Sequence, residues 1–495
     1  MRTLLLSRRH LLRTIAALAG ARATGLVPRD VLALLEPDAS DPCAMLRQAL
    51  PPRNHERQRA EAAARRAALA ISLLERGKAE CVWPLLSRDE DATTRSHIIC
   101  DMARARVRPA ILIERLGAST TSAEERQALI LALGGYSSAA LPAPFRRRIL
   151  PWLLRWFRMD PDPGVHGAVK WLLGTRRPLL LPTRLDWGTE PELRAAAAGL
   201  PSDPESNRHW FVNSAGYTMI CLRGEPTFAM GSPSYELDRF SDERIHRVQI
   251  PRDFAIATTE TTARQFDAYL NESPQVQAKH AQEIAARFRR PQALTPELDC
   301  PAVAVTWYEA AQYCNWLSHR EGLPESEWCF PDTEIFETGL RLPPDYLHRS
   351  GYRLPTEAEW EFAARAGTTT ARFFGLSRDL LSEYAWSTES SRNARTLPVA
   401  CLKPNDLGLF DMLGNAWEWC LDRRQSYPVE LDTLVIDRED SNTVVDDSTA
   451  RTRRGGSFTY DAASARSACR GDVSYFPMQR RDSVGFRVAR TLPHA

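Results

Sequence analysis

Apolar residues recur at three- and four-residue spacing through most of the first 175 residues, which is the pattern of helices with one buried face. The pattern predicts helices over 56–76, 95–106, 124–133, 145–157 and 165–173. Short runs of turn-forming residues separate these segments, among them Gly134-Gly135 and the Asp- and Pro-rich stretch 160–164. We therefore expect an all-α region at this end of the chain.

Three of the predicted helices share a further pattern at their start. An acidic or hydroxyl residue precedes a basic residue by four positions, and Ala or Leu follows at helical spacing; the basic residues are Arg95, Arg126 and His166. This arrangement resembles degenerate HEAT-like helical pairs, which stack into a solenoid because one pair cannot bury its apolar face alone. A compact all-helical domain without repeats is the alternative interpretation.

The character of the sequence changes twice after residue 175. A Pro-rich stretch of low periodicity comes first, and from Trp210 onward short β-like runs, Gly, Trp and long irregular connections replace the helices. We predict three parts: a helical, HEAT-like region over 1–175, a linker over 176–209 that packs partly on its neighbours, and an α+β, loop-rich domain over 210–492.

The start of the second domain mixes strand and helix signals. Residues 227–232 form a short strand ending in a Gly turn, and 248–257 alternate with a period of two, as a half-buried strand does. A helix is expected over 263–270. Another follows from Trp307 and places Ala310, Cys314 and Leu317 on one side.

Four motifs follow in order along this domain. The first, R-L-P-T-E-A-E-W-E at 353–361, predicts a helix with Thr356 and Glu359 as its capping box and Gly367 after its end. The others are G-L-F-D-M-L-G-N-A-W-E-W at 408–419, R-G-G-S-F at 454–458 and V-G-F-R-V at 484–488. Together they resemble the formylglycine-generating-enzyme, or sulfatase-modifying-factor, family, whose fold is related to C-type lectins.

The resemblance implies a specific chemistry and the residues that it needs. In active family members two cysteines shortly after the G-G-S turn bind copper(I) and oxidise a cysteine of a sulfatase peptide to formylglycine; soft thiolates select that ion. Here the first position falls at Tyr460, and the second falls within Ala462, Ala463, Ser464 and Ala465. Cys469 lies beyond this window and is expected to be a buried thiol. We therefore expect neither copper binding nor catalytic residues of this kind.

A second chemistry of the family is also disfavoured. Ergothioneine-type relatives use iron held by an H-x-x-x-H-x-E arrangement in a companion helical domain. The helical half of this chain has only His10, His55, His97 and His166, and none has that spacing. The sequence also contains no phosphate-binding loop, serine nucleophile elbow or H-E-x-x-H motif.

A structural calcium site is the family feature that the sequence retains. In family members one side-chain oxygen, two main-chain carbonyls and a Glu carboxylate hold the ion, and the matching positions here are Asp411, Gly414, Ala416 and Glu418. Oxygen ligands suit a hard cation, and Asp in place of the usual Asn adds charge. The alternative is a hydrogen-bonded turn without an ion.

Charge is distributed unevenly along the 495 residues. Residues 1–200 contain 31 Arg and Lys against 20 Asp and Glu, and the remainder contains 33 against 42. Only four of the basic residues are Lys, so we interpret the basic half as an Arg-rich solvated surface. Because aromatic residues are not interleaved with the basic ones, a nucleic-acid partner is not expected.

The cysteines and the N-terminal residues bear on localisation. Ten cysteines without a C-x-x-C pair are typical of isolated buried thiols in a reducing compartment, so we expect a cytoplasmic protein. S-R-R-H-L-L at 7–12 resembles a twin-arginine export signal, but the uncharged stretch after it is only eight residues long. Export therefore remains the alternative, and no membrane span is expected.

Large side chains and loops complete the expectations for the second domain. Most tryptophans should be core, and Arg353, Arg365, Arg470 and Arg487 should pair with interior carboxylates. Segments 271–298, 323–350 and 425–453 are expected to be exposed, variable insertions. The acidic third segment is either a solvated loop or a recognition or proteolysis site.

These observations favour a non-oxidase binding or regulatory protein, that is, a pseudoenzyme. Its partner would be a protein that contacts the helical region and the lectin-like loops. Bacterial domains that resemble this one accompany kinases, caspase-like peptidases and defence systems, in which they are thought to act as sensors, binders or protease targets. The alternative is an active member of the superfamily with non-standard catalytic residues.

Overall fold

The computed structural model describes residues 42–174, 185–200, 207–288, 295–333, 335–391, 395–429, 434–471 and 474–493. The possible export motif at 7–12 lies outside these ranges. None of the helices within them is both long and apolar enough to cross a lipid bilayer.

Helices and short 3₁₀ turns make up the described part of the chain before residue 200, as the apolar periodicity predicts. The elements are α3 (Pro42–Leu46), α4 (Glu56–Glu75), η1 (Ala79–Cys81), η2 (Trp83–Leu86), α5 (Thr93–Arg104), α6 (Pro109–Gly117), α7 (Ala123–Leu133), α8 (Ala143–Met159), α9 (Pro163–Leu173) and α10 (Glu190–Ala197). The five predicted helices correspond to α4, α5, α7, α8 and α9. The predicted linker also contains a helix, α10, whose Leu193 and Ala196 join the helical core.

Helices α4, α5, α7 and α9 pack in a row, and α6 and α8 pack on α7 and α9 from outside that row. The Ser122 and Asp162 side chains cap α7 and α9, and the Asp160 carboxylate before α9 pairs with Arg126 of α7. These contacts connect neighbouring helices in the way that stacked pairs require. The HEAT-like assignment itself stays a prediction.

Four small sheets and several helices form the second domain. One sheet has the order β1-β2-β5-β13-β7, all antiparallel, and the others are β11-β8-β12, β3-β4-β9 and β10-β6. The strands are β1 (Trp210–Val212), β2 (Thr218–Leu222), β3 (Thr227–Met230), β4 (His246–Gln249), β5 (Phe254–Ala257), β6 (Leu340–Arg341), β7 (Tyr352–Arg353), β8 (Trp417–Arg423), β9 (Leu434–Ile436), β10 (Val444–Val445), β11 (Arg451–Arg454), β12 (Val484–Gly485) and β13 (Ala489–Thr491).

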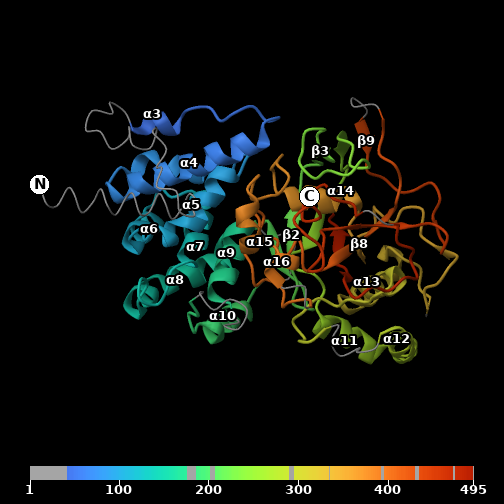
Figure 1. Cartoon of the computed structure of the whole chain (residues 1–495). Coiled ribbons are helices and arrows are strands. Elements are labelled where there is room, and N and C mark those ends of the chain that lie inside the picture. The colour runs from blue at the N-terminus through green and yellow to red at the C-terminus, as the bar shows by residue number, and fades with distance from the viewer. Residues whose placement is uncertain are drawn as a thin grey trace, which may run out of the picture.

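The helices of this domain are α11 (Ala263–Glu272), α12 (Pro274–Arg287), α13 (Trp307–Arg320), α14 (Glu357–Arg365), α15 (Leu381–Tyr384) and α16 (Thr388–Ser391), with 3₁₀ turns η4 (Glu325–Glu327) and η5 (Arg378–Leu380). The predicted capping box of Thr356 and Glu359 starts α14, which ends at Ala366 in the left-handed conformation before Gly367. Figure 1 shows the first-half helices as one body beside this domain.

Two of the expected exposed insertions are more ordered than predicted. Segment 271–298 contains α12, whose Val276 is buried. In segment 425–453 the Asp437 carboxylate is buried against Arg252, and Arg451 and Arg453 are also buried. The interpretation of the third segment as a solvated acidic loop is therefore wrong at these residues. Asp437 pairs with an arginine that is distant in the sequence, so no local pattern revealed its burial.

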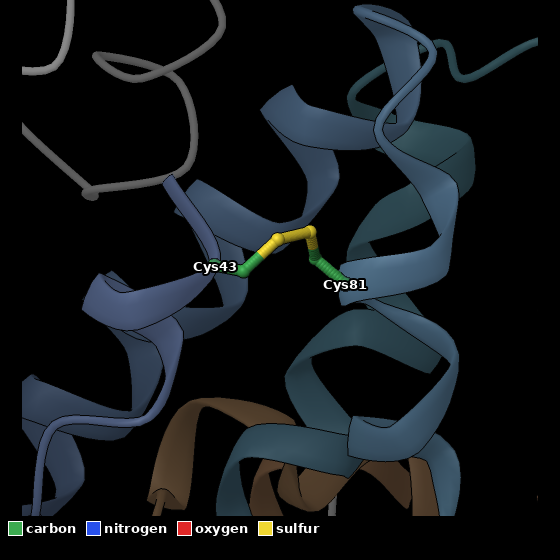
Figure 2. The surroundings of a disulfide bond; sticks show 2 residues. All are labelled: Cys43 and Cys81. Atoms are coloured by element: carbon green, nitrogen blue, oxygen red, sulfur yellow. A yellow bond between two sulfur atoms is a disulfide. The ribbon is translucent and has the colours of Figure 1, made fainter. Parts of the chain in front are cut away.

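One disulfide bond departs from the expectation of isolated thiols. Cys43 of α3 is joined to Cys81 of η1, and the two Cα atoms are 5.3 Å apart (Figure 2). Their separation of 38 residues gives no local spacing signal, which is why the sequence did not reveal the pair. The eight cysteines outside this bond are all buried. The bond removes the argument from cysteine usage for a reducing compartment.

The helical region packs closely against the second domain through α5, α7 and α9. The Arg95 guanidinium pairs with Asp406, and the Gln127 side chain donates to the Asn405 carbonyl at 3.1 Å. Gly167 of α9 lies so close to Gly408 that an added Cβ would stand 2.7 Å from the Gly408 Cα. The inner row of helices is therefore covered by the chain's own second domain.

Gly167→Ala should lower the free energy of unfolding by about 1–3 kcal/mol, because the new methyl group overpacks a backbone contact that cannot yield easily. Denaturant unfolding would measure the loss. Gly199→Ala is the matched control, since no atom lies within 4 Å of a Cβ at that position. Equal effects of the two substitutions would contradict the close docking of α9.

Buried ion pairs around α14 hold the second domain together. Both terminal nitrogens of Arg353 donate hydrogen bonds to the Glu359 carboxylate, at 2.6 and 2.7 Å. The Arg252 Nε atom donates to the same carboxylate at 2.8 Å. Burial alone would raise the pKa of Glu359, but the charges of Arg353 and Arg252 outweigh it and lower the pKa to about 2. The other predicted pairs are confirmed as Arg365–Glu361, Arg470–Glu357 and Arg487–Glu418.

Asp422 sits beside this network without a basic partner in the described contacts. Its carboxylate accepts the Glu357 backbone N–H, while burial and the negative charges of Asp437 and Glu357 raise its pKa to about 8. The folded protein therefore holds a proton on Asp422 that the unfolded chain releases near the ordinary Asp range.

The stability contributed by protonated Asp422 should be complete at low pH and disappear as the pH rises through about 8. Asp422→Asn keeps an uncharged group at this position. The variant should therefore gain stability relative to the wild type between pH 5 and about pH 9. Urea unfolding of both proteins across this range measures the difference, and parallel pH profiles would contradict the raised pKa.

Candidate functional site

The segment that follows the G-G-S turn packs against α16 and against the loop before β8. Gly455 and Gly456 both have positive φ, and an added Cβ on Gly456 would stand 2.9 Å from the Ser464 carbonyl oxygen. The Phe458 N–H donates to the Asn415 carbonyl, and the Thr388 N–H donates to the Tyr460 carbonyl, at 2.9 and 3.0 Å. The turn thus places Tyr460 between α16 and the loop before β8.

Tyr460, where we expect the first copper-cysteine position of the family, packs against Trp417. Its ring meets the Trp417 ring edge-on, with centroids 5.4 Å apart. The Arg453 guanidinium lies over Trp417 at 4.3 Å and over Tyr475 at 3.6 Å. Aromatic and guanidinium groups of this kind fill space and stack, and they offer no soft ligand for copper(I).

The second copper-cysteine position falls in a segment that is mostly buried. Ala462, Ser464 and Ala465 are buried, and Ala463 is partly exposed. The Arg372 and Arg466 side chains donate to the carbonyl oxygens of Ala462 and Ala463 at 2.7 and 2.8 Å. The window therefore serves as packed backbone, and no side chain in it provides sulfur.

Cys469, the nearest thiol in sequence, belongs to the hydrophobic core. It is fully buried among the residues that pack around Trp417 and Trp419. Burial and the negative charge of Glu243 raise the pKa of the Cys469 thiol to about 11, so it stays protonated at neutral pH. The residues present do not fit the two-thiolate copper site of the family.

The helical half does not assemble a histidine site within its described residues. The His166 ring stacks on Phe157, packs against Trp210 and shares a 2.8 Å hydrogen bond with the Phe157 carbonyl. Burial lowers the pKa of His166 to about 3, so it is neutral. His97 lies on a different helix and contacts Asp101. His166 is therefore a packing residue between the two halves of the chain.

The predicted calcium turn brings three carboxylates together. Asp411 and Asn415 both adopt positive φ, and the Asp411 Oδ2 atom accepts the Ala400 N–H at 2.8 Å. The Asp411 Oδ1 atom is buried and has no hydrogen-bond partner among the residues that the structure describes. Glu418 is held by Arg487 through two hydrogen bonds of 2.6 and 2.7 Å and also accepts the Trp360 indole N–H.

Glu260 is the third carboxylate, and sequence reasoning missed it. It accepts the Ala416 N–H at 3.0 Å and the Asn415 side-chain amide at 2.8 Å. Burial and the charges of Asp411 and Glu418 raise the pKa of Glu260 well above its usual range. Glu260 stands in a Thr-rich stretch 150 residues before the turn, and only its contact with the turn reveals its role.

The charges of this cluster do not balance. Glu260, Asp411 and Glu418 carry three potential negative charges, and Arg487 supplies one positive charge. Burial raises the pKa of Asp411 to about 6. The described residues contain no group of three or more His, Cys, Asp or Glu side chains placed to hold a metal ion. A cation at this turn therefore depends on main-chain carbonyls as well, as the family pattern implies.

Comparison with known proteins identifies the second domain. Residues 213–492 match the model of the sulfatase-modifying factor enzyme 1-like domain. The chain belongs to this family. The match covers more than half of the chain and contains the Tyr460 segment, the calcium-type turn and the α14 ion pairs.

Individual relatives differ in name and in the share of each protein that aligns. The chain is 28% identical to the formylglycine-generating enzyme of Streptomyces coelicolor over 53% of this chain and 86% of that protein. It is 34% identical to the chaperone protein LppX of Paenibacillus barcinonensis over 24% of this chain and about half, 51%, of that protein. It is 30% identical to the serine/threonine-protein kinase pkn1 of Chlamydia pneumoniae, over 41% of this chain and 27% of the kinase.

Proposed function

We propose that the protein is a binding or regulatory module of the sulfatase-modifying-factor family that does not form formylglycine with copper. The observation that carries the proposal is the chemistry of the two ligand positions. Tyr460 meets Trp417 edge-on where the first thiolate would stand, and the segment from Ala462 to Ala465 supplies packed backbone where the second would stand. A single protonated thiol in the core, Cys469, cannot replace a pair of thiolates.

The purified protein, loaded with copper(I) in air, should not convert a peptide containing C-T-P-S-R to its formylglycine form. Mass spectrometry of the peptide measures the conversion, with an active formylglycine-generating enzyme as the positive control. Tyr460→Cys should also remain inactive, because a second sulfur is still missing. Turnover by the wild-type protein would overturn the proposal.

Protein binding is the activity best supported by the surfaces that remain. Helices α5, α7 and α9 face the chain's own second domain, so a partner of the helical region would contact the outer helices α6 and α8. Helix α8 exposes Phe145 at its start, and Met159 is exposed at its end. Exposed apolar side chains beside the arginines of α8 suit a protein partner with an acidic surface.

A kinase or a caspase-like peptidase in a bacterial signalling or defence system remains the proposed class of partner. The alignment with the Chlamydia pneumoniae kinase supports a kinase as the partner. It covers about a quarter, 27%, of that protein, so a segment similar to this chain occurs within a protein named as a kinase. If a peptidase cleaves the acidic insertion, the cut should fall near Val429, which is 76% exposed. The region around Asp437 is held by Arg252 and is a poorer substrate.

We also propose a structural calcium ion at the turn, held by Asp411, Glu418 and the main-chain carbonyls of Gly414 and Ala416. The buried, unpartnered Asp411 Oδ1 atom and the excess of carboxylates support this proposal. The ion would neutralise the cluster and fix the loop before β8. We propose a structural role for the ion, because the Asp411 and Glu418 carboxylates contact other groups of the protein interior.

Calcium should raise the unfolding temperature relative to the same protein in chelator. The stabilisation would be about 2.7 kcal/mol at a concentration a hundredfold above the Kd. Differential scanning calorimetry measures the shift. Asp411→Ala should abolish the calcium-dependent part, whereas the control Asp461→Ala, at an exposed position, should retain it. No shift in the wild type, or an equal shift in Asp411→Ala, would rule out this site.

A further inference from the structure

A cavity of about 310 Å³ opens between α11, α12, α13 and residues Trp328, Asp332, Thr333 and Phe336. None of the residues that line it belongs to the Tyr460 segment or to the calcium-type turn. Two of the insertions that the sequence marks as variable, 271–298 and 323–350, meet here and form walls of the cavity. The cavity is therefore a separate place on the domain at which a ligand can bind.

Aromatic side chains form much of its wall: Tyr269, Trp316, Trp328 and Phe336. The Tyr269 and Trp316 ring centroids are 5.8 Å apart, and the His319 ring meets Trp328 edge-on. Trp316 is only partly buried, unlike the other tryptophans of the motifs, because it faces this space. Faces of electron-rich rings attract cations, and tryptophan does so most strongly.

Two polar side chains of the cavity wall, Asn315 and Tyr269, are buried. The Asn315 side-chain amide donates to the carbonyls of Phe330 and Pro331 at 3.1 and 3.0 Å, which fixes its orientation. The Asn315 Oδ1 atom and the Tyr269 hydroxyl are then buried without a hydrogen-bond partner among the described residues. Both atoms are enclosed by the protein, so the polar contact that the open part of the cavity offers comes from the exposed Asp332 carboxylate.

The charge of the cavity also favours a cation. Its lining contains the carboxylates of Glu272 and Asp332 and no Lys or Arg. Arg320 outside the lining neutralises Glu272, and the N-terminus of α12 adds roughly half a positive charge. Asp332 outweighs that half charge, so the balance remains negative.

The chain itself already places a cation on this wall. The Arg320 guanidinium lies over Trp316 at 5.1 Å and pairs with Glu272 at 2.7 Å, while the Trp316 indole N–H donates to Glu272 at 2.8 Å. An aromatic face combined with a carboxylate thus binds a positively charged group at the edge of the cavity. Trp328 and Asp332 offer the same two chemical groups without such an occupant in the lining.

We propose that this cavity binds a protonated alkylamine, supplied either as a free small amine or as a lysine side chain of a protein partner. The ammonium group would face Asp332, and its methylene chain would lie against the aromatic rings. The lysine source rests on the proposed binding function, whereas the free amine does not.

Saturation-transfer NMR with the full chain tests the proposal with n-butylammonium and Nα-acetyl-lysine methylamide. N-acetyl-norleucine methylamide and n-pentanol are the uncharged counterparts. Both ammonium ligands, or one of them, should bind at least about fivefold more tightly than the uncharged counterparts. Preference for the lysine derivative indicates a protein source, and preference for butylammonium indicates a free amine.

Asp332→Asn should weaken ammonium binding about fivefold, and Asp379→Asn, at an exposed carboxylate outside this cavity, should leave it unchanged. Equal binding of charged and uncharged ligands, absence of binding, or insensitivity to Asp332→Asn would overturn the proposal. Formylglycine turnover would refute the proposed function but would not change the measured ammonium binding. The proposed function and the proposed amine site can therefore fail independently.

Discussion

The second domain depends on buried pairs between arginines and the three glutamates of α14. Its strands are two to seven residues long and its connections are irregular. Backbone hydrogen bonds between strands therefore connect only a few distant segments. Glu357, Glu359 and Glu361 bind arginines from β4–β5, β7, β11 and the segment after Cys469. Removing one partner leaves an uncompensated buried charge, which costs about 3–5 kcal/mol.

The Tyr460 segment is held by packing that needs no thiol. The turn at Gly455-Gly456 lies against Ser464, and the Trp417 ring contacts Tyr460. The helical region adds rigidity from outside, because Phe410 of the second domain belongs to the helical core. Tyr460 and the segment from Ala462 to Ala465 are therefore packed without any sulfur ligand.

Sequence patterns predicted those elements that are determined by residues close together in the chain. The apolar periodicity located the helices, and the Thr356–Glu359 capping box located the start of α14. The partners of Arg353 and Arg487 were predicted only as unnamed carboxylates, because spatial proximity across the fold decides them. Glu260, the Cys43–Cys81 bond and the burial of Asp437 were missed for the same reason. The aromatic cavity was not predicted either, because its walls come from two insertions that are adjacent only in the folded chain.

The central claim is that the domain has the fold of the family without its copper ligands. Competition for copper(I) against a chromogenic chelator tests it most directly, with the wild type and Cys469→Ala side by side. Neither protein should remove copper(I) from the chelator, and the two titrations should coincide. Tight one-to-one binding by the wild type that is lost in Cys469→Ala would contradict the central claim.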